Sequence, residues 1–329
     1  MADYKGIKGF KVEQIASDPT VNEGQTWYNT TSNVLKYDTV GAAAWGSGGN
    51  LNTPRGNNMG YTTGTATAAL TFGGHETTLK EETESYNGTS WTETGNAMNT
   101  ARYNGGSQGT QTATVCFGGG TPGAVTTVEL YNGSSWSEST AMPTAAYGLA
   151  PAGSSSIAAL AISGVNPPST FVNEAFELTG TSWTEIADVT TARQSGSAAG
   201  TVTAALFVCG STGAPLYARD LVESFNGTSW TASTATPADR YGIPSFGTQT
   251  ACMTAGGAGP SGASEKTTFY WNGSSWTELA DLTTARYSNA TARGGTSASG
   301  LYVGSASSPY QATEEWNESP AQVKTVTTS

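Results

Sequence analysis

Stretches of small residues and short hydrophobic runs alternate with turn residues in a pattern that residues 102–138 show completely. The second run, TATVCF, ends in two glycines, and the third, TTVELY, leads into Asn132-Gly133. Asn-Gly between two extended runs supplies the positive φ angles of a type I′ hairpin turn. The pattern therefore predicts four short antiparallel strands. In chain order they lie at 104–110, 112–117, 126–131 and around Trp136.

This pattern recurs six times along the chain. Tryptophans mark the copies at separations of 46, 45, 47, 47 and 46 residues, namely Trp45, Trp91, Trp136, Trp183, Trp230 and Trp276. About ten residues after each Trp comes a second marker, usually Thr-Ala-Arg, which ends at Arg55, Arg102, Ala146, Arg193, Arg240 and Arg286. Four strands in about 46 residues is the size of one propeller blade. The repeats therefore predict an all-β fold, a six-bladed β-propeller of four-stranded antiparallel blades.

The ends of the repeat region indicate how the propeller closes. The last copy has an aromatic residue at Trp316 but lacks the fourth strand with its own tryptophan. The segment 42–45 supplies such a strand at the other end, so we expect closure by this N-terminal strand. The predicted organisation is an N-terminal arm with a β-hairpin (1–36), a propeller (37–318) and a C-terminal tail (319–329). A seven-bladed alternative, with the hairpin 26–37 as a partial blade, stays open.

The repeat resembles the kelch motif. The resemblance rests on the double glycine after the second strand, the aromatic near the end of the third strand and the Trp five residues later. It covers roughly residues 37–318, nearly the whole chain, and implies a propeller of the kelch type. The third copy departs from the motif, because Gly164 stands without a second glycine and Leu178 holds the aromatic position.

Charge and cysteine content narrow the classes of partner. The chain has 14 Lys and Arg against 25 Asp and Glu, a formal net charge of −11. Nucleic acid is held by clustered cations, so we expect no nucleic-acid partner and no binding to an anionic membrane. The three cysteines, Cys116, Cys209 and Cys252, lie in apolar stretches of different copies and indicate buried free thiols. Because we find neither a signal peptide nor an apolar membrane span, we expect synthesis in a host cytoplasm and no membrane insertion.

Chemistry-bearing residues are sparse. The kelch family includes a copper oxidase, but copper of that kind needs imidazole ligands, and His75 is the only histidine. We therefore expect no metal, no cofactor and no histidine-dependent catalysis. Two acidic clusters, 81–84 and 314–315, contain Glu81, Glu82, Glu84, Glu314 and Glu315. We expect these third-strand acids on a solvated outer face, which favours a protein that is not an enzyme. A glycan-degrading enzyme with a carboxylate pair stays open as an alternative.

One face of the predicted propeller has variable loops, where recognition usually occurs. These loops lie at 73–80, 118–125, 163–173, 210–219, 256–266 and 304–310. The same face is expected to carry the marker arginines and the tyrosines that follow the marker in four copies, including Tyr147. The candidate binding residues are Arg55, His75, Arg102, Tyr103, Arg193, Tyr217, Arg219, Arg240, Tyr241, Arg286 and Tyr287. Two interpretations remain, a clamp between neighbouring blades and a polar, aromatic-lined funnel for a glycan or peptide.

The N-terminal arm suggests a setting for the protein. The segment 6–37, and within it GQTWYNTTSNVLKY (24–37), resembles the N-terminal arms of structural proteins of tailed bacteriophages, particularly marine ones. The resemblance implies a virion protein, tail-associated or fibre-like, that is held by other virion proteins through its arm and is multimeric in the particle. Its propeller would bind a host-surface glycan, a protein receptor or a neighbouring virion protein. A capsid decoration or head-fibre protein is the alternative within this class.

Overall fold

The computed structural model describes residues 12–17, 26–39, 43–55, 61–213, 218–287, 291–292, 296–305, 310–317 and 322–325. These residues form β-strands joined by turns and loops, and no helix is found among them. Accordingly, this part of the chain contains no apolar helix of membrane-spanning length. The strands form seven four-stranded sheets. The prediction of an all-β fold is confirmed.

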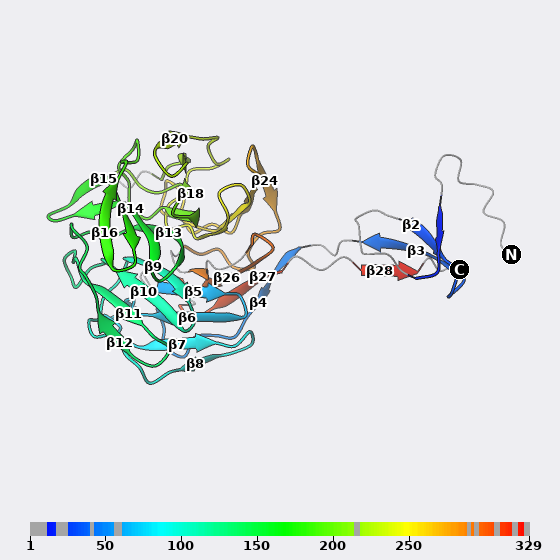
Figure 1. Cartoon of the computed structure of the whole chain (residues 1–329), viewed down its shortest axis with the longest axis horizontal. Coiled ribbons are helices and arrows are strands. Elements are labelled where there is room, and N and C mark those ends of the chain that lie inside the picture. The colour runs from blue at the N-terminus through cyan, green and yellow to red at the C-terminus, as the bar shows by residue number, and fades with distance from the viewer. Residues whose placement is uncertain are drawn as a thin grey trace. The chain divides into compact units, whose positions relative to one another are not determined.

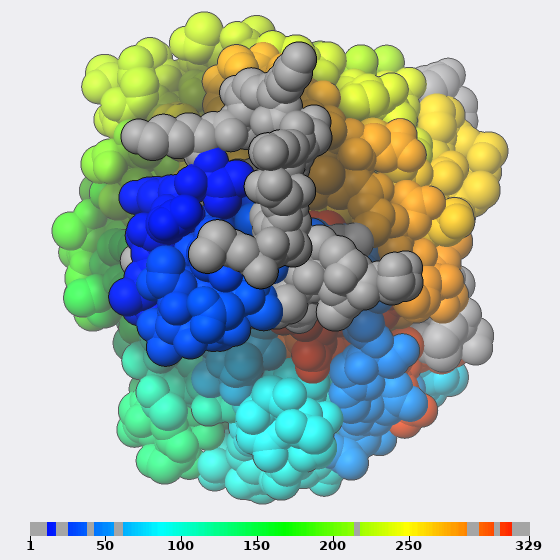
Figure 2. All heavy atoms as spheres, turned by 90° about the vertical axis from the view of Figure 1, so that its right-hand side faces the viewer, coloured from blue at the N-terminus to red at the C-terminus, as the bar shows by residue number. Residues whose placement is uncertain are grey.

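The chain divides into two compact units. Unit 1 comprises 1–44 together with 318–329, and unit 2 comprises 45–317. Six of the seven sheets, here called sheets A to F, are built from the strands β4 to β27 (Figure 1). In Figure 2 the segments of unit 2 follow one another around the unit in chain order, from cyan through green and yellow to orange.

Sheets A to E each use four consecutive strands, and every pairing within them is antiparallel. Sheet A consists of β5 (Tyr61–Thr65), β6 (Ala68–Phe72), β7 (Thr83–Tyr86) and β8 (Trp91–Glu93). Sheet B consists of β9 (Gly106–Thr110), β10 (Ala113–Phe117), β11 (Val128–Tyr131) and β12 (Trp136–Glu138). Sheet C consists of β13 (Ala150–Ser155), β14 (Ala158–Asn166), β15 (Thr170–Thr179) and β16 (Ser182–Ile186).

Sheet D consists of β17 (Ser197–Thr201), β18 (Ala204–Val208), β19 (Val222–Phe225) and β20 (Trp230–Ala232). Sheet E consists of β21 (Ser245–Gly247), β22 (Cys252–Ala255), β23 (Thr268–Trp271) and β24 (Trp276–Leu279). Sheet F differs because its strands come from both ends of unit 2. Its order is β25 (Thr291–Ala292), β26 (Ser299–Val303), β27 (Thr313–Asn317) and β4 (Ala44–Ser47).

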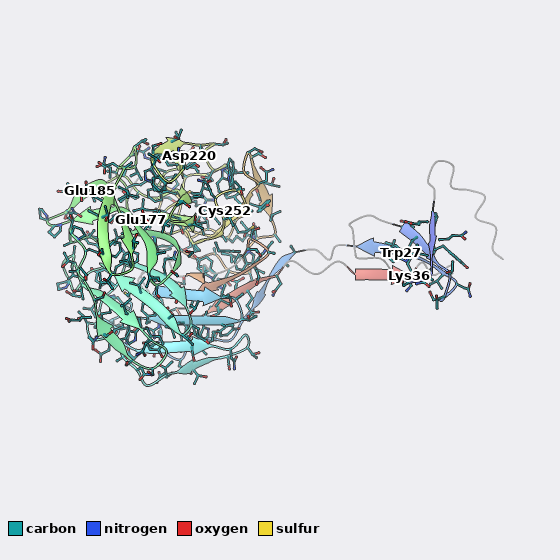
Figure 3. The ribbon with its side chains drawn as sticks, viewed as in Figure 1. Trp27, Lys36, Glu177, Glu185, Asp220 and Cys252 are labelled. Carbon is teal, nitrogen blue, oxygen red and sulfur yellow. The ribbon has the colours of Figure 1, made fainter. Side chains whose placement is uncertain are left out.

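The second strand of each sheet supplies most of the core. Strands such as β10 and β18 read as nearly continuous apolar runs and are buried along most of their length. Strands buried on both faces lose the polar alternation of a half-exposed strand. The three cysteines are buried, and none of them forms a disulfide bond in the described part of the chain, as predicted. Figure 3 shows Cys252 in the interior of unit 2 and the exposed Glu185 at the outer rim of sheet C.

Tryptophans at the start of the fourth strands join neighbouring sheets. Trp136 of sheet B donates its indole N–H to Thr83 Oγ1 of sheet A at 3.0 Å. The same contact joins sheets F and E, where Trp45 donates to Thr268 Oγ1 at 2.9 Å. The recurrence of these tryptophans in the sequence therefore has a packing cause, because each covers the preceding sheet.

Unit 1 contains the seventh sheet. Its strand order is β1 (Glu13–Ile15), β2 (Thr26–Asn29), β3 (Val34–Thr39) and β28 (Gln322–Thr325). Strand β1 is parallel to β2, whereas β2–β3 and β3–β28 are antiparallel. The hairpin predicted at 26–37 is thus present, and it pairs with a strand from the C-terminal tail.

Candidate binding site

The marker arginines lie inside unit 2. Their exposed fractions are 8 % or less, and four of them pair with a buried glutamate of the third strand in the same sheet. The pairs are Arg55–Glu84, Arg102–Glu129, Arg193–Glu223 and Arg286–Glu314. A buried guanidinium needs such a partner, since an unpaired charge in the interior is strongly unfavourable.

Each of these carboxylates also accepts a hydrogen bond from the backbone of the segment that leads into its sheet. The second oxygen of Glu129 accepts the backbone N–H of Asn99, three residues before Arg102, at 2.7 Å. Glu223 accepts the N–H of Thr190 in the same way, also at 2.7 Å. One carboxylate therefore ties both the arginine and the backbone of the connection between sheets.

The backbone of the marker links each sheet to the one before it. Gly74, the second glycine of the pair in sheet A, donates to the carbonyl of Arg102 at 2.9 Å. Gly164 of sheet C donates to the carbonyl of Arg193 at 3.0 Å, although its sheet has a serine in place of the first glycine. These contacts agree with the interpretation of the marker as a clamp between neighbouring sheets.

Two sheets depart from the pairing. In sheet C neither charge is present, because Ala146 stands at the marker and the buried Phe176 at the position of the glutamate. In sheet E the arginine remains but Phe269 replaces the glutamate. Arg240 instead lies 3.8 Å from the half-exposed Glu265 of the loop before β23.

The expectation of a solvated face for the third-strand acids is wrong for two of them. Glu84 is fully buried and Glu314 is 1 % exposed. Each lies two residues before a buried aromatic residue, Tyr86 or Trp316, so the acid and the ring share one face of the strand. This repeated acid was the signal in the sequence for the ion pair with the marker arginine.

The residue after the marker lies against the loop between the second and third strands of its own sheet. Tyr103 and Gly120 exchange two backbone hydrogen bonds, at 3.2 and 2.8 Å. Tyr147 pairs with Val165 and Tyr241 with Ala258 in the same way. These three tyrosines and the loops beside them therefore lie on one face.

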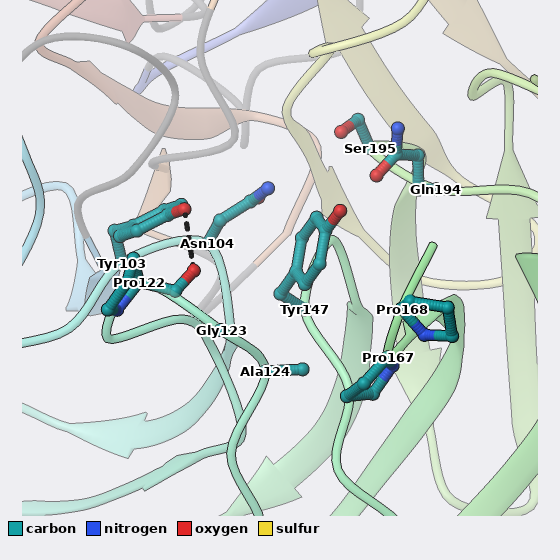
Figure 4. Close-up of a pocket in the computed structure, with 10 residues that line it drawn as sticks. All are labelled: Tyr103, Asn104, Pro122, Gly123, Ala124, Tyr147, Pro167, Pro168, Gln194 and Ser195. Atoms are coloured by element: carbon teal, nitrogen blue, oxygen red, sulfur yellow. Dashed lines mark hydrogen bonds between the residues drawn. The ribbon is translucent and has the colours of Figure 1, made fainter. Parts of the chain in front are cut away.

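A cavity of about 500 Å³ lies on this face, across the loops of sheets B, C and D (Figure 4). From the connections into the three sheets it is lined by Tyr103, Asn104, Tyr147, Gln194 and Ser195. From the loops after β10 and β14 it is lined by Pro122, Gly123, Ala124, Pro167 and Pro168.

Two lining residues, Asn104 and Ser195, take part in hydrogen bonds that run from sheet to sheet. Gly148 donates its N–H to the carbonyl of Asn104 at 2.6 Å, and Ser195 donates to Gly148 at 2.9 Å. Gly242 continues the chain by donating to Ser195 at 2.7 Å. Asn104 and Ser195 have φ angles of +57° and +54°, the left-handed conformation that these contacts require.

Tyr103 is fixed in the cavity wall by its surroundings. It donates its hydroxyl to the carbonyl of Pro122 at 3.3 Å. Burial raises the pKa of Tyr103, and the neighbouring phenol of Tyr147 adds to the effect. The Tyr103 phenol therefore stays neutral at physiological pH.

Four of the other candidate residues have contacts of their own in unit 2. The ring of His75 lies 5.9 Å from that of Tyr103, and Tyr241 and Tyr287 pack together with their rings 6.0 Å apart. Arg219 is exposed and donates its Nε–H to Thr212 Oγ1 at 2.9 Å. Tyr217 lies outside the described residues. Of the described residues in the predicted set, Tyr103 alone lines the cavity.

No clustered set of metal ligands is found in the described ranges. Groups of three or more His, Cys, Asp or Glu side chains that could hold a metal ion do not occur there. The residues that do gather at the loop face are tyrosines, prolines and amides. Such a set can stack on a ring and exchange hydrogen bonds with a neutral ligand.

Comparison with solved structures defines the class of fold. The solved structure of YjhT matches 84 % of this chain over 99 % of its own length, with a TM-score of 0.65 and 14 % sequence identity. No protein-family model matches the chain, and no curated protein matches it. At this identity the likeness shows the fold alone. Together with the four-stranded antiparallel sheets, it indicates a β-propeller-like fold.

Proposed function

We propose that the chain is a six-bladed, kelch-type propeller that acts as a non-enzymatic binding protein of a tailed-phage particle. In this proposal sheets A to F are the blades, and β4 closes the ring by completing sheet F beside β27. The repeated indole contact supports closure, because Trp91 of sheet A donates to Thr313 of sheet F at 3.0 Å. A propeller completed in this way leaves no free sheet edge within the ring.

The cavity on the loop face carries the assignment of a binding role. It lies between loops that differ from sheet to sheet, on a scaffold held by buried ion pairs and inter-sheet hydrogen bonds. Recognition residues are commonly placed on variable loops of a rigid scaffold. The described lining contains no aspartate or glutamate, and a glycosidase needs two carboxyl groups at the sugar. We therefore favour binding over glycan hydrolysis.

Unit 1 is proposed as the attachment segment. It is a compact unit of its own, and its sheet joins the N-terminal arm to the C-terminal tail through β3 and β28. The resemblance of the segment 24–37 to arms of phage structural proteins supports a role in holding the propeller on a particle. Other virion proteins are the partners expected for this unit.

The particle assignment is tested by mass spectrometry of purified virions and by immunogold electron microscopy with antibody against unit 2. We expect the protein in the particle, with label at the tail or its fibres. Label on the head would select the capsid-decoration or head-fibre alternative. Absence of the protein from purified particles would contradict the proposal.

A further inference from the structure

We propose that the cavity lined by Tyr147 and Gln194 binds one ring of a neutral saccharide. The inference deepens the proposed binding function and rests on it. The cavity volume of about 500 Å³ falls within the range of about 300–1,000 Å³ that is usual for small-molecule sites. Figure 4 shows the Tyr147 side chain standing between Asn104 and the group formed by Gln194 and Pro168.

Tyr147 provides the stacking surface. Its backbone is fixed by two hydrogen bonds to Val165, at 3.1 and 2.9 Å, and its side chain is half-buried. The face of an aromatic ring carries partial negative charge, which attracts the C–H bonds on the less polar face of a pyranose. Because the backbone position is held before a ligand arrives, little ordering cost is added on binding.

Gln194 provides the hydrogen-bonding partner. Its backbone is paired with Ser211 at 2.9 and 2.8 Å, so its side chain is presented from a fixed position. Within the described part of the chain, no hydrogen bond engages the Gln194 side-chain amide or the Tyr147 hydroxyl. A primary amide offers two donors and one acceptor oxygen, which matches neighbouring hydroxyl groups that both donate and accept.

The charges of the site select a neutral sugar over an acidic one. The described lining residues carry no charged side chain, and the whole chain has a formal net charge of −11. An acidic saccharide would find no cation in the cavity and would be repelled by the protein as a whole. A proline-rich peptide is the competing ligand for an aromatic surface. It is disfavoured because Pro122, Pro167 and Pro168 already form the apolar walls, leaving amide and hydroxyl groups for the ligand.

The test uses the full-length protein and a defined set of probes. Linear hexasaccharides of glucose, mannose and galactose are titrated by calorimetry, beside hexagalacturonate and decaproline. Saturation-transfer NMR identifies which sugar protons contact an aromatic ring. The variants are Tyr147→Ala and Gln194→Ala, and Tyr270→Ala is the matched control, since Tyr270 is a half-buried tyrosine of β23 outside the cavity.

We expect at least one neutral hexasaccharide to bind, with saturation transfer to its ring C–H protons. Each cavity variant should weaken this binding at least tenfold, while Tyr270→Ala leaves the affinity unchanged and all melting temperatures stay close to that of the parent. Failure of every neutral probe at millimolar concentration, preference for hexagalacturonate or decaproline, or unchanged affinity in Tyr147→Ala would overturn the inference. Retention of the protein in virions alongside such a result would leave the particle assignment standing, so the two failures are distinguishable.

Discussion

Trp91 donates its indole N–H to Thr313 Oγ1 at 3.0 Å and so joins strand β8 of sheet A to strand β27 of sheet F. These residues lie 222 positions apart in the chain. The contact has the same form as that between Trp136 and Thr83, which are in successive sheets. Sheets A and F are thus joined in the way that consecutive sheets are.

Removal of the acceptor should weaken this join. In Thr313→Val the shape is kept, but the buried indole N–H of Trp91 loses its partner. An unsatisfied buried donor costs about 1–3 kcal/mol, so we expect urea unfolding to report a loss of this size. An unchanged free energy of unfolding in Thr313→Val would contradict the assigned role of the contact.

Between sheets B and C the protein already lacks the acceptor for this indole contact. Val128 of sheet B occupies the position of Thr83 and Thr313, and the Nε1 of Trp183 in sheet C has no hydrogen-bond partner within the described residues. Val128→Thr places a hydroxyl at this position. We expect it to accept a hydrogen bond from the indole and to raise the free energy of unfolding by about 0.5–1.5 kcal/mol. An unchanged or lower free energy of unfolding in Val128→Thr would indicate that the hydroxyl does not reach the indole.

The buried ion pairs predict a strong asymmetry between single and double substitutions. Glu223→Gln leaves the guanidinium of Arg193, which is fully buried, without a counter-ion. Breaking a buried pair in this way costs about 3–5 kcal/mol. The double variant Arg193→Ala with Glu223→Phe copies the residues of sheet C, where Ala146 and Phe176 pack without charge.

We expect the double variant to lose less stability than the sum of its two single variants. Interacting residues show coupling energies of about 0.5–3 kcal/mol, and denaturant unfolding of all four proteins measures this term. Additive losses would show that Arg193 and Glu223 contribute independently.

The strand pattern could be predicted because it is local. Asn132-Gly133 and Trp136 define a hairpin by their conformational and packing preferences, and β11 and β12 form at these residues. The Arg–Glu pairs could not be assigned with the same reasoning. The repeats show that an arginine recurs at the position of Arg102 and a glutamate at that of Glu129. Whether the two side chains meet depends on the three-dimensional path of the connection between sheets.

The cavity was beyond prediction for a related reason. The sequence identifies its loops as variable. It does not show that the side chains of Gln194, Pro122 and Pro168 come together to line one cavity. The pairing of β28 with β3 was missed as well. A four-residue segment with no distinctive hydrophobic pattern does not indicate which strand it will join.

The glycines in the first strands of the sheets lead to a further prediction about stability. Gly200 of β17 has a φ of +104°, and a Cβ added there would lie 2.1 Å from the carbonyl oxygen of Ala204. Gly64, Gly109, Gly153 and Gly247 meet the next strand in the same way. Gly200→Ala combines an unfavourable φ with a backbone clash, so we expect a loss of about 1–3 kcal/mol or more.

Gly46→Ala is the matched control. Gly46 lies in β4, is exposed, and has no atom within 4 Å of an added Cβ. We expect its melting temperature to equal that of the parent, whereas that of Gly200→Ala falls by several degrees. Equal melting temperatures for the two variants would show that the sheet relaxes around Gly200.

Cys209 makes a prediction for thiol chemistry. Its side chain is fully buried and lies 3.3 Å from Thr236 Oγ1. Burial raises the pKa of the Cys209 thiol to about 11, and the thiolate is the reactive form. Native protein at pH 8 should therefore leave this residue unmodified by iodoacetamide, and denaturation should expose it. Mass spectrometry of the alkylated peptides measures both states, and rapid labelling of Cys209 in the native protein would show that it is accessible.

The same shift predicts a loss of stability in alkali. A thiol whose pKa is 9 in the unfolded chain and about 11 in the folded one favours the folded state fully below pH 9. This contribution, at most about 2–3 kcal/mol, is lost as the pH rises from 9 through 11. Cys209 has a φ of +58° at the position where sheets A, B and E have the first glycine of the pair, so Cys209→Gly fits the backbone and removes the thiol. Between pH 9 and 11 the free energy of unfolding should fall less steeply in Cys209→Gly than in the parent, and parallel slopes would rule out this residue as the source of the alkaline loss.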